Sequence, residues 1–165
     1  MSGLPATVHA AAVLAGARAV LIRGASGTVK SRLALDLLAA APGRLRFARL
    51  VGDDRVRLEC AGGRLLVRPA AALAGLIEVR GVGILRLDYE PCAVVGLVVD
   101  LDAADAERLP EHRSAVVEGI NLPRLPLAAG APALPGVLAV ITSTETGFEA
   151  GLLSGDCRHS AKSGV

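Results

Sequence analysis

An apolar strand, a glycine-rich loop and the start of a helix follow one another near the N-terminus, and this junction limits the possible folds most. Ala19–Ile22 has the composition of a buried strand, and Ser31–Ala41 has leucines at helical spacing. Between them lies the segment Gly24-Ala25-Ser26-Gly27-Thr28-Val29-Lys30-Ser31. In such a loop, consecutive backbone N–H groups and the helix N-terminus face the same point. The junction therefore predicts an α/β domain with a phosphate-binding loop.

The loop follows the pattern GxxxxGK[ST] except at one position. Lys30 would carry a compact positive charge to the outer phosphates, and the hydroxyl of Ser31 can bind Mg²⁺. Only two of the 18 basic residues are Lys, which suggests that position 30 requires this residue for its chemistry. Val29 replaces the second glycine, and its β-branched side chain is stiff and bulky at that point. A glycine-rich turn that binds nothing is the alternative interpretation.

Composition narrows the class of protein further. The 165 residues are 52% hydrophobic and 21% charged, which predicts one folded domain over residues 1–153, followed by a disordered tail over 154–165. A net charge of +2 and 2% aromatic residues argue against a nucleic-acid partner. Three widely spaced cysteines favour a reducing compartment, and no apolar run is long enough to span a bilayer. We expect a cytoplasmic protein without a membrane partner.

The remaining pattern predicts more strands than helices. Strands are expected in 7–14, 19–22, 45–51, 56–60, 64–67, 84–87, 93–99 and 137–141, with helices in 31–41, 69–76 and 144–153. Ala61-Gly62-Gly63 is typical of a hairpin turn between two of these strands. The fold class expected is α/β, with a mixed, strand-rich sheet.

Three further groups of residues could carry chemistry. Asp53 and Asp54 follow a strand, where adjacent carboxylates suit metal binding or general-base catalysis, although Gly-Asp-Asp is also common in turns. The segment Glu78-Val79-Arg80-Gly81-Val82-Gly83-Ile84 combines two glycines with an acid and a base. His9, on an apolar strand, is by itself more typical of a core residue than of a catalyst.

Taken in order, these groups resemble the catalytic domain of the HPr kinase/phosphorylase family. The resemblance covers roughly Thr7 to Ile141, and the Glu78–Ile84 segment is its most specific part. Members of that family use ATP to phosphorylate a serine of the phosphocarrier protein HPr of the phosphotransferase system. The resemblance implies a P-loop domain related to the phosphoenolpyruvate carboxykinase fold, ATP and Mg²⁺ as cofactors, an HPr-like carrier as partner, and a homo-oligomer.

The resemblance also implies roles for single residues. The segment Gly24 to Ser31 would hold the ATP phosphates, with Lys30 stabilising the charge that develops on transfer. Ser31 and Glu78 would be Mg²⁺ ligands. Asp53 would accept the proton of the target serine, with Asp54 beside it adjusting charge or metal and His9 orienting the pair.

The sequence departs from the family at several points. The loop begins at residue 24, as in members made of the kinase domain alone, and the stretch Leu134–Leu138 lacks the family's basic Arg-Asn segment. Arg108 and Arg113 are candidates for docking the carrier, or for a solvated surface loop. Two alternative functions stay open: a nucleotide- or carrier-binding regulator impaired by Val29, and an unrelated P-loop NTPase.

Overall fold

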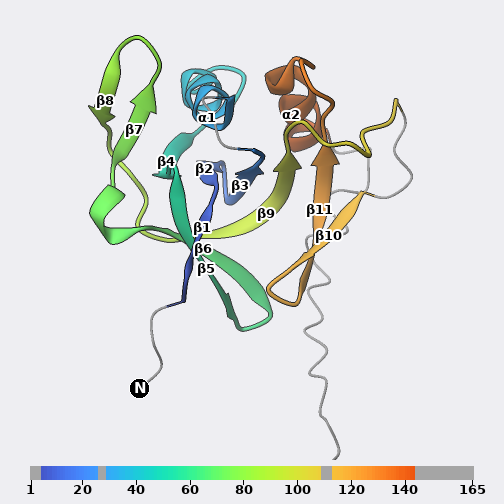
Figure 1. Cartoon of the computed structure of the whole chain (residues 1–165), viewed down its shortest axis with the longest axis horizontal. Helices are drawn as coiled ribbons and strands as arrows, with labels where there is room; N and C mark the ends of the chain where they lie inside the picture. The colour runs from blue at the N-terminus through green and yellow to red at the C-terminus, as the bar shows by residue number, and fades with distance from the viewer. Residues whose placement is uncertain (1–4, 26–28, 109–112, 144–165) are drawn as a thin grey trace, which may run out of the picture.

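The computed structural model describes residues 5–25, 29–108 and 113–143. Their secondary structure is dominated by short strands (Figure 1). The strands are β1 (Thr7–His9), β2 (Ala11–Ala15), β3 (Arg18–Arg23), β4 (Ala48–Gly52), β5 (Arg55–Ala61), β6 (Arg64–Pro69), β7 (Leu76–Val79), β8 (Gly83–Arg86), β9 (Ala93–Asp100), β10 (Ser114–Val117) and β11 (Ile120–Pro126). The helices are α1 (Val29–Ala39), α2 (Ala133–Thr142) and the 3₁₀ turn η1 (Ala71–Leu73).

Nine of these strands form one mixed sheet. Its order is β1-β5-β6-β9-β3-β2-β4, and the β10–β11 hairpin joins it through β11. The strand β9 runs parallel to β3 and to β11, whereas its pairing with β6 is antiparallel. The β7–β8 hairpin is a separate two-stranded sheet. This arrangement confirms the predicted α/β class with a strand-rich sheet.

Two apolar clusters hold the domain together. Both α-helices lie on one side of the sheet (Figure 1). There, Leu33 and Leu37 of α1 and Val137 of α2 form one buried cluster with sheet residues such as Ile22 and Val99. A second cluster lies where β5 and β6 pack against the central strands, with residues such as Val56, Leu65, Leu21 and Val98. Complete burial of one such side chain contributes about 1.5–3 kcal/mol, so the two clusters fix the strand ends that carry the polar residues.

The helix α1 forms where the leucine spacing predicted it. Leu33, Ala34 and Leu37 recur at intervals of three and four residues, and all are buried against the sheet. The helix ends at Ala39, shortly before Pro42 and Gly43, which has a φ of 153°. None of the described helices is long and apolar enough to cross a bilayer.

The β5–β6 hairpin also confirms a local prediction. Gly62 and Gly63 have φ values of 58° and 75°, as a two-residue turn between twisted strands requires. Val56, Leu58, Leu65 and Val67 then face the second cluster from opposite sides of the turn.

Several sequence predictions about elements were wrong. The strand predicted for 7–14 is two strands, because β1 pairs with β5 whereas β2 pairs with β3 and β4. Val137–Ile141 is not a strand but part of α2, because a short apolar run does not distinguish a strand from a buried helix. Residues 69–76 form no longer helix: they include the end of β6 at Pro69, the short turn η1 and the first residue of β7, a strand that was not predicted. The strands β10 and β11 were missed, since Pro123 and Pro126 made that region look irregular. The helix predicted for 144–153 and the tail over 154–165 lie outside the described residues.

Candidate functional site

Two strand ends and one helix start define the candidate site. The strand β3 ends at Arg23, before Gly24 and Ala25, and α1 begins at Val29. The strand β4 ends at Gly52, so that Asp53 and Asp54 occupy the connection to β5. Because α1 packs against β4, the first turn of the helix lies beside this acidic connection. Ser26, Gly27 and Thr28, predicted to bind phosphate, lie outside the described residues.

Gly52 allows this close packing. A Cβ atom at position 52 would lie 2.8 Å from Cγ1 of Val56 and 3.3 Å from Cα of Pro69. Both distances are shorter than the contacts that packed neighbours allow without moving. The glycine before the acidic pair is therefore needed for packing, and the polar turn at Asp53-Asp54 starts from a rigid strand end.

Asp53 is the hydrogen-bonding centre of the site. Its side chain is buried, with 4% of the residue exposed. The hydroxyl of Ser31 lies 2.8 Å from Oδ1 and 2.9 Å from Oδ2, and the backbone N–H of Glu78 donates to Oδ2 at 3.2 Å. A buried carboxylate needs such donors, because desolvation would otherwise destabilise the ionised form. Asp53 thus connects α1, β4 and β7.

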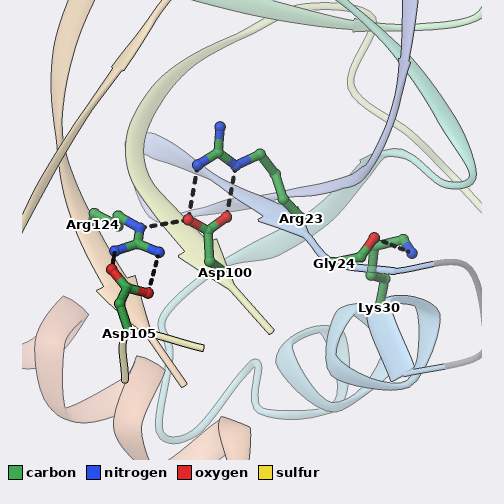
Figure 2. A network of polar contacts seen from close by, with 6 residues as sticks. All are labelled: Arg23, Gly24, Lys30, Asp100, Asp105 and Arg124. Atoms are coloured by element: carbon green, nitrogen blue, oxygen red, sulfur yellow. Dashed lines mark hydrogen bonds and ion pairs between the residues drawn. The ribbon is translucent and has the colours of Figure 1, made fainter. Parts of the chain in front are cut away.

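Lys30 is the second buried charged residue of the site. Only 3% of it is exposed, and Nζ donates to the carbonyl oxygens of Gly24 at 3.1 Å and Ala25 at 2.6 Å. Figure 2 shows the side chain turned towards Gly24. Burial lowers the pKa of Lys30 below its usual value, against the opposing effect of Asp53 and the weaker effects of Asp54 and Asp102. The ammonium group is held at the start of the loop.

Asp54 and His9 form a pair at the exposed edge of the site. Nε2 of His9 lies 3.0 Å from Oδ1 of Asp54, and 34% and 62% of the two side chains are exposed. Pairing of β1 with β5 sets this contact, since His9 is opposite Arg55 in the register. Asp54 has a φ of 63°, which is a left-handed backbone conformation. Its side chain therefore has a different direction from the side chain of Asp53. The two adjacent carboxylates therefore have different partners and different exposure.

Val29 and Glu78 lie at a concavity of about 660 Å³ between α1 and β7. Val29 is 52% exposed and Glu78 is also exposed. The concavity is lined by Val29, Arg32, Leu35, Asp36, Ala39, Glu78, Val79 and Arg80. The side chain of Val29 is thus directed towards solvent at the start of the helix. The side chain of Glu78 lies at the same surface.

A second polar cluster lies on the other side of the loop and was not predicted. Arg23 holds both oxygens of Asp100, from Nε to Oδ1 at 2.7 Å and from Nη2 to Oδ2 at 2.8 Å. Arg124 also binds Asp100 and forms two hydrogen bonds, of 2.6 and 3.0 Å, with Asp105 (Figure 2). These residues come from the ends of β3 and β9, from β11 and from the loop after β9.

Ion pairing controls the protonation of this second cluster. Burial opposes ionisation of Asp100, but the hydrogen bonds from Arg23 and Arg124 hold its pKa below the usual value. The hydrogen bond from Arg124 likewise lowers the pKa of the exposed Asp105, and these two carboxylates raise that of Arg124. A sequence signal existed: both Arg23 and Asp100 are charged residues that end apolar strands.

The residues predicted to bind metal are close together but have different contacts. Ser31 and the backbone of Glu78 share Asp53 as their hydrogen-bond acceptor. Across the described ranges, no group of three or more His, Cys, Asp or Glu side chains forms a metal cage. The hydroxyl and carboxylate oxygens of Ser31 and Asp53 are nevertheless the donor types that fit Mg²⁺, which commonly keeps water and phosphate ligands besides one or two carboxylates.

Comparison with known proteins identifies the family. Residues 5–90 match the family model described as the HPr Serine kinase C-terminal domain. The chain belongs to this family. Its described site lies within that range, apart from the cluster around Asp100.

Two curated relatives agree with this family. An HPr kinase/phosphorylase of Geobacillus thermodenitrificans is 35% identical over 137 residues, which cover 74% of this chain and 41% of the relative. One of an Exiguobacterium species is 40% identical over 98 residues, covering 54% of this chain and 30% of the relative. The chain thus spans less than half the length of these relatives.

A solved structure supports the fold. The structure described as the Hpr(Ser) kinase/phosphatase from Coxiella burnetii superposes with a TM-score of 0.68 at 22% sequence identity. The superposition covers 82% of this chain and 93% of that one. The superposed share of the chain is larger than residues 5–90, so the similarity of fold extends beyond the range that the family model matches.

Proposed function

We propose that this protein is an ATP-dependent kinase that phosphorylates a serine of an HPr-like phosphocarrier protein in the cytoplasm. Family membership supports the reaction class. The observation that carries the proposal is the contact between Ser31 and Asp53, with Lys30 as the adjacent residue on the same helix turn. This contact brings a hydroxyl, a carboxylate and an ammonium group to the N-terminus of one helix, as phosphoryl transfer requires.

ATP binding rests on the segment Gly24 to Ser31 and on α1. The N-terminal end of the helix favours an anion, and the Lys30 ammonium group lies beside the loop carbonyls of Gly24 and Ala25. Lys30 needs little movement to exchange these carbonyls for phosphate oxygens, because it is already directed towards the loop. Its charge would stabilise the outer phosphate as negative charge shifts during transfer.

Mg²⁺ binding rests on Ser31, Asp53 and Glu78. Ser31 and Asp53 supply hard oxygen atoms within hydrogen-bond distance of each other, and the exposed Glu78 carboxylate belongs to the strand whose backbone already binds Asp53. The ion would neutralise phosphate charge when bound. Asp53 accepts the hydrogen bond of the Ser31 hydroxyl and so positions it at the first turn of α1.

The proton acceptor is better assigned to Asp54 than to Asp53. The oxygens of Asp53 are buried and occupied by Ser31 and by the N–H of Glu78. Asp54 is exposed and bonded to His9, so the carboxylate can meet a hydroxyl on the surface of another protein. The imidazole would orient Asp54 and stabilise it after it takes up the proton. This division changes the role that the family resemblance implied for Asp53.

A binding-only regulator is the second candidate function. Val29 supports it, because the family pattern has glycine where this chain has an exposed β-branched residue at the start of α1. A stiff side chain at this point would restrict how closely phosphate approaches the backbone. Family membership disfavours the third possibility, an unrelated NTPase.

The test is phosphate transfer from labelled ATP to a purified HPr protein in the presence of Mg²⁺. Wild type, Val29→Gly, Asp53→Asn and Asp54→Asn are compared, with Asp88→Asn as a control at an exposed carboxylate. We expect transfer by wild type, and a loss of about 10³-fold in Asp54→Asn with ATP binding retained. Asp53→Asn should reduce transfer and should also weaken Mg²⁺-dependent ATP binding.

Two results would change the interpretation. Transfer only by Val29→Gly, with HPr binding by both proteins, would favour the regulator. Full activity in Asp54→Asn combined with loss of transfer but retained nucleotide binding in Asp53→Asn would return the proton-acceptor role to Asp53.

A further inference from the structure

One face of the β5–β6 hairpin carries an unusual concentration of arginines. Residues two apart along a strand share a face, and so do directly paired residues. The register Arg57 opposite Arg68 and Ala61 opposite Arg64 therefore places four arginines on the same side, defined here as the arginine face: Arg55, Arg57, Arg64 and Arg68. The opposite side of the hairpin is apolar and buried.

The arginine face is open to solvent. Arg55, Arg64 and Arg68 are exposed, and Arg57 is partly exposed. The hairpin lies away from α1 and α2 (Figure 1), so neither helix covers it. Along β5, the face extends about 20 Å from Arg55 to the turn, at about 3.3 Å per residue. A second protein has free access to this surface.

The charges of this face are not balanced within the part of the chain that the structure describes. Glu59 is the acidic residue of the hairpin on this side, and it lies 3.6 Å from Arg68. Arg57 faces Arg68 directly across the strands, and its Nε is buried without a hydrogen-bond partner. Like charges opposite each other destabilise a sheet, as does an unpaired buried donor. Apart from the exposed Glu59–Arg68 ion pair, this arrangement does not stabilise the fold, so a role in binding explains it better.

The face begins at the candidate site. Arg55 follows Asp54 in the chain and is paired with His9 in the register between β1 and β5. The exposed His9–Asp54 pair therefore lies at one end of the arginine face. A protein bound along the hairpin would bring its own surface groups to this pair.

We infer that the arginine face docks an acidic surface of the phosphate-accepting protein and directs the acceptor hydroxyl to the His9–Asp54 pair. This inference rests on the proposed function and identifies the surface that recognises its substrate. Arginine suits the task because its planar group binds carboxylates through two hydrogen bonds and is weakly hydrated. A nucleic acid fits less well, because the face has no aromatic side chain on which a base could stack.

The test compares two charge reversals of equal size. Arg64→Glu/Arg68→Glu reverses the far part of the face, away from the reacting groups. Arg44→Glu/Arg46→Glu makes the same change in net charge at two exposed arginines between α1 and β4. Binding of purified HPr is measured directly, together with the KM for HPr and the KM for ATP in the transfer reaction. Thermal unfolding checks the fold. Arg68→Glu removes the exposed ion pair with Glu59 but places a carboxylate opposite Arg57, so only a small change in Tm is expected.

We expect the reversal on the face to weaken HPr binding and raise its KM by about tenfold, with kcat and the KM for ATP unchanged. The control reversal should leave all four quantities within twofold. The wild-type association rate should also fall with added salt, and the face variant should lose most of this dependence.

Other outcomes overturn the inference in distinguishable ways. Phosphate transfer by wild type with equal HPr affinity in both variants would refute the docking surface and leave the proposed function intact. No transfer and no HPr binding by wild type would refute both. Binding of a single-stranded RNA or of anionic vesicles that the face reversal abolishes, while HPr binding is unchanged, would assign the surface to that other partner.

Discussion

The two polar clusters beside the glycine-rich loop differ in how their charges are satisfied. Around Asp100, each charged group meets an opposite charge: Arg23 and Arg124 bind Asp100, and Asp105 binds Arg124. Around Asp53, the buried carboxylate is bound by a hydroxyl and a backbone N–H, and the buried Lys30 by two backbone carbonyls. The first cluster neutralises itself, whereas the second keeps a cation and an anion bound to neutral partners.

This difference indicates a separate role for each cluster. Ion pairs that satisfy one another connect the ends of β3, β9 and β11 and fix the base of the loop. Charges held by neutral groups can exchange those groups for a ligand without breaking an ion pair. We therefore expect substitutions near Asp100 to affect stability, and substitutions near Asp53 to affect binding and turnover.

The largest effect is expected for Lys30→Met. Loss of the ammonium group should reduce phosphate transfer by about 10³-fold, because the other described basic residue in the first turn of α1, Arg32, is exposed and paired with Asp36 instead of being directed towards the loop. The fold should be retained within about 1 kcal/mol, since replacing a buried charge by an apolar chain of similar volume is commonly neutral. Urea unfolding and transfer assays on the same sample measure both. A loss of stability as large as the loss of activity would remove the distinction between the clusters.

A smaller effect of the opposite type is expected for Asp100→Asn. Two arginines lose their shared carboxylate, and the free energy of unfolding should fall by about 2–3 kcal/mol. The value is moderate because 37% of the Arg23 side chain is exposed and can be hydrated. Asp105→Asn is the matched control, because the carboxylate of Asp105 binds the same Arg124 from the exposed side. This substitution should lower the free energy of unfolding by less than Asp100→Asn does. Equal losses in both variants would show that Asp100 has no special part in the connection.

The smallest effect is the pH dependence, and its sign separates the two clusters. The folded-state pKa of Asp100 is lowered, so its stabilising contribution is present above the unfolded value near 4 and is lost as pH falls below it. The folded-state pKa of Lys30 is also lowered, but for a base this means that burial of the charge destabilises the protein at neutral pH. That penalty is relieved as pH rises from the lowered pKa towards the ordinary value near 10.4.

Urea unfolding as a function of pH tests this prediction. Asp100→Asn should flatten the loss of stability below about pH 4, and Lys30→Met should remove a gain on the alkaline side. Each variant serves as the control for the other. Identical profiles for wild type and both variants would contradict the assignment of these shifts to Asp100 and Lys30.

Local patterns predicted the elements on which the site is built. The leucines of α1, the glycine pair of the β5–β6 turn and the apolar run of β9 each specify their structure through contacts or dihedral angles within a few residues. The strand prediction for Val137–Ile141 was wrong because a five-residue apolar run fits a strand and a helix equally well. Val137 and Leu138 pack on the sheet as part of the helix α2. The prolines of β11 obscured a strand that pairs first with β10 and then with β9.

The sequence by itself determined which chemical groups this protein has available: a lysine and a serine after a glycine-rich loop, an adjacent pair of carboxylates, a histidine and the Glu78–Ile84 segment. Only the tertiary structure decided how they are used. Asp53 and Asp54 are adjacent residues of the same type, yet Asp53 is buried against Ser31 and Asp54 is exposed beside His9. The arginine face and the ion pairs of Asp100 likewise depend on strand register and on strands far apart in the chain. These contacts link residues tens of positions apart, and no local pattern encodes such distances.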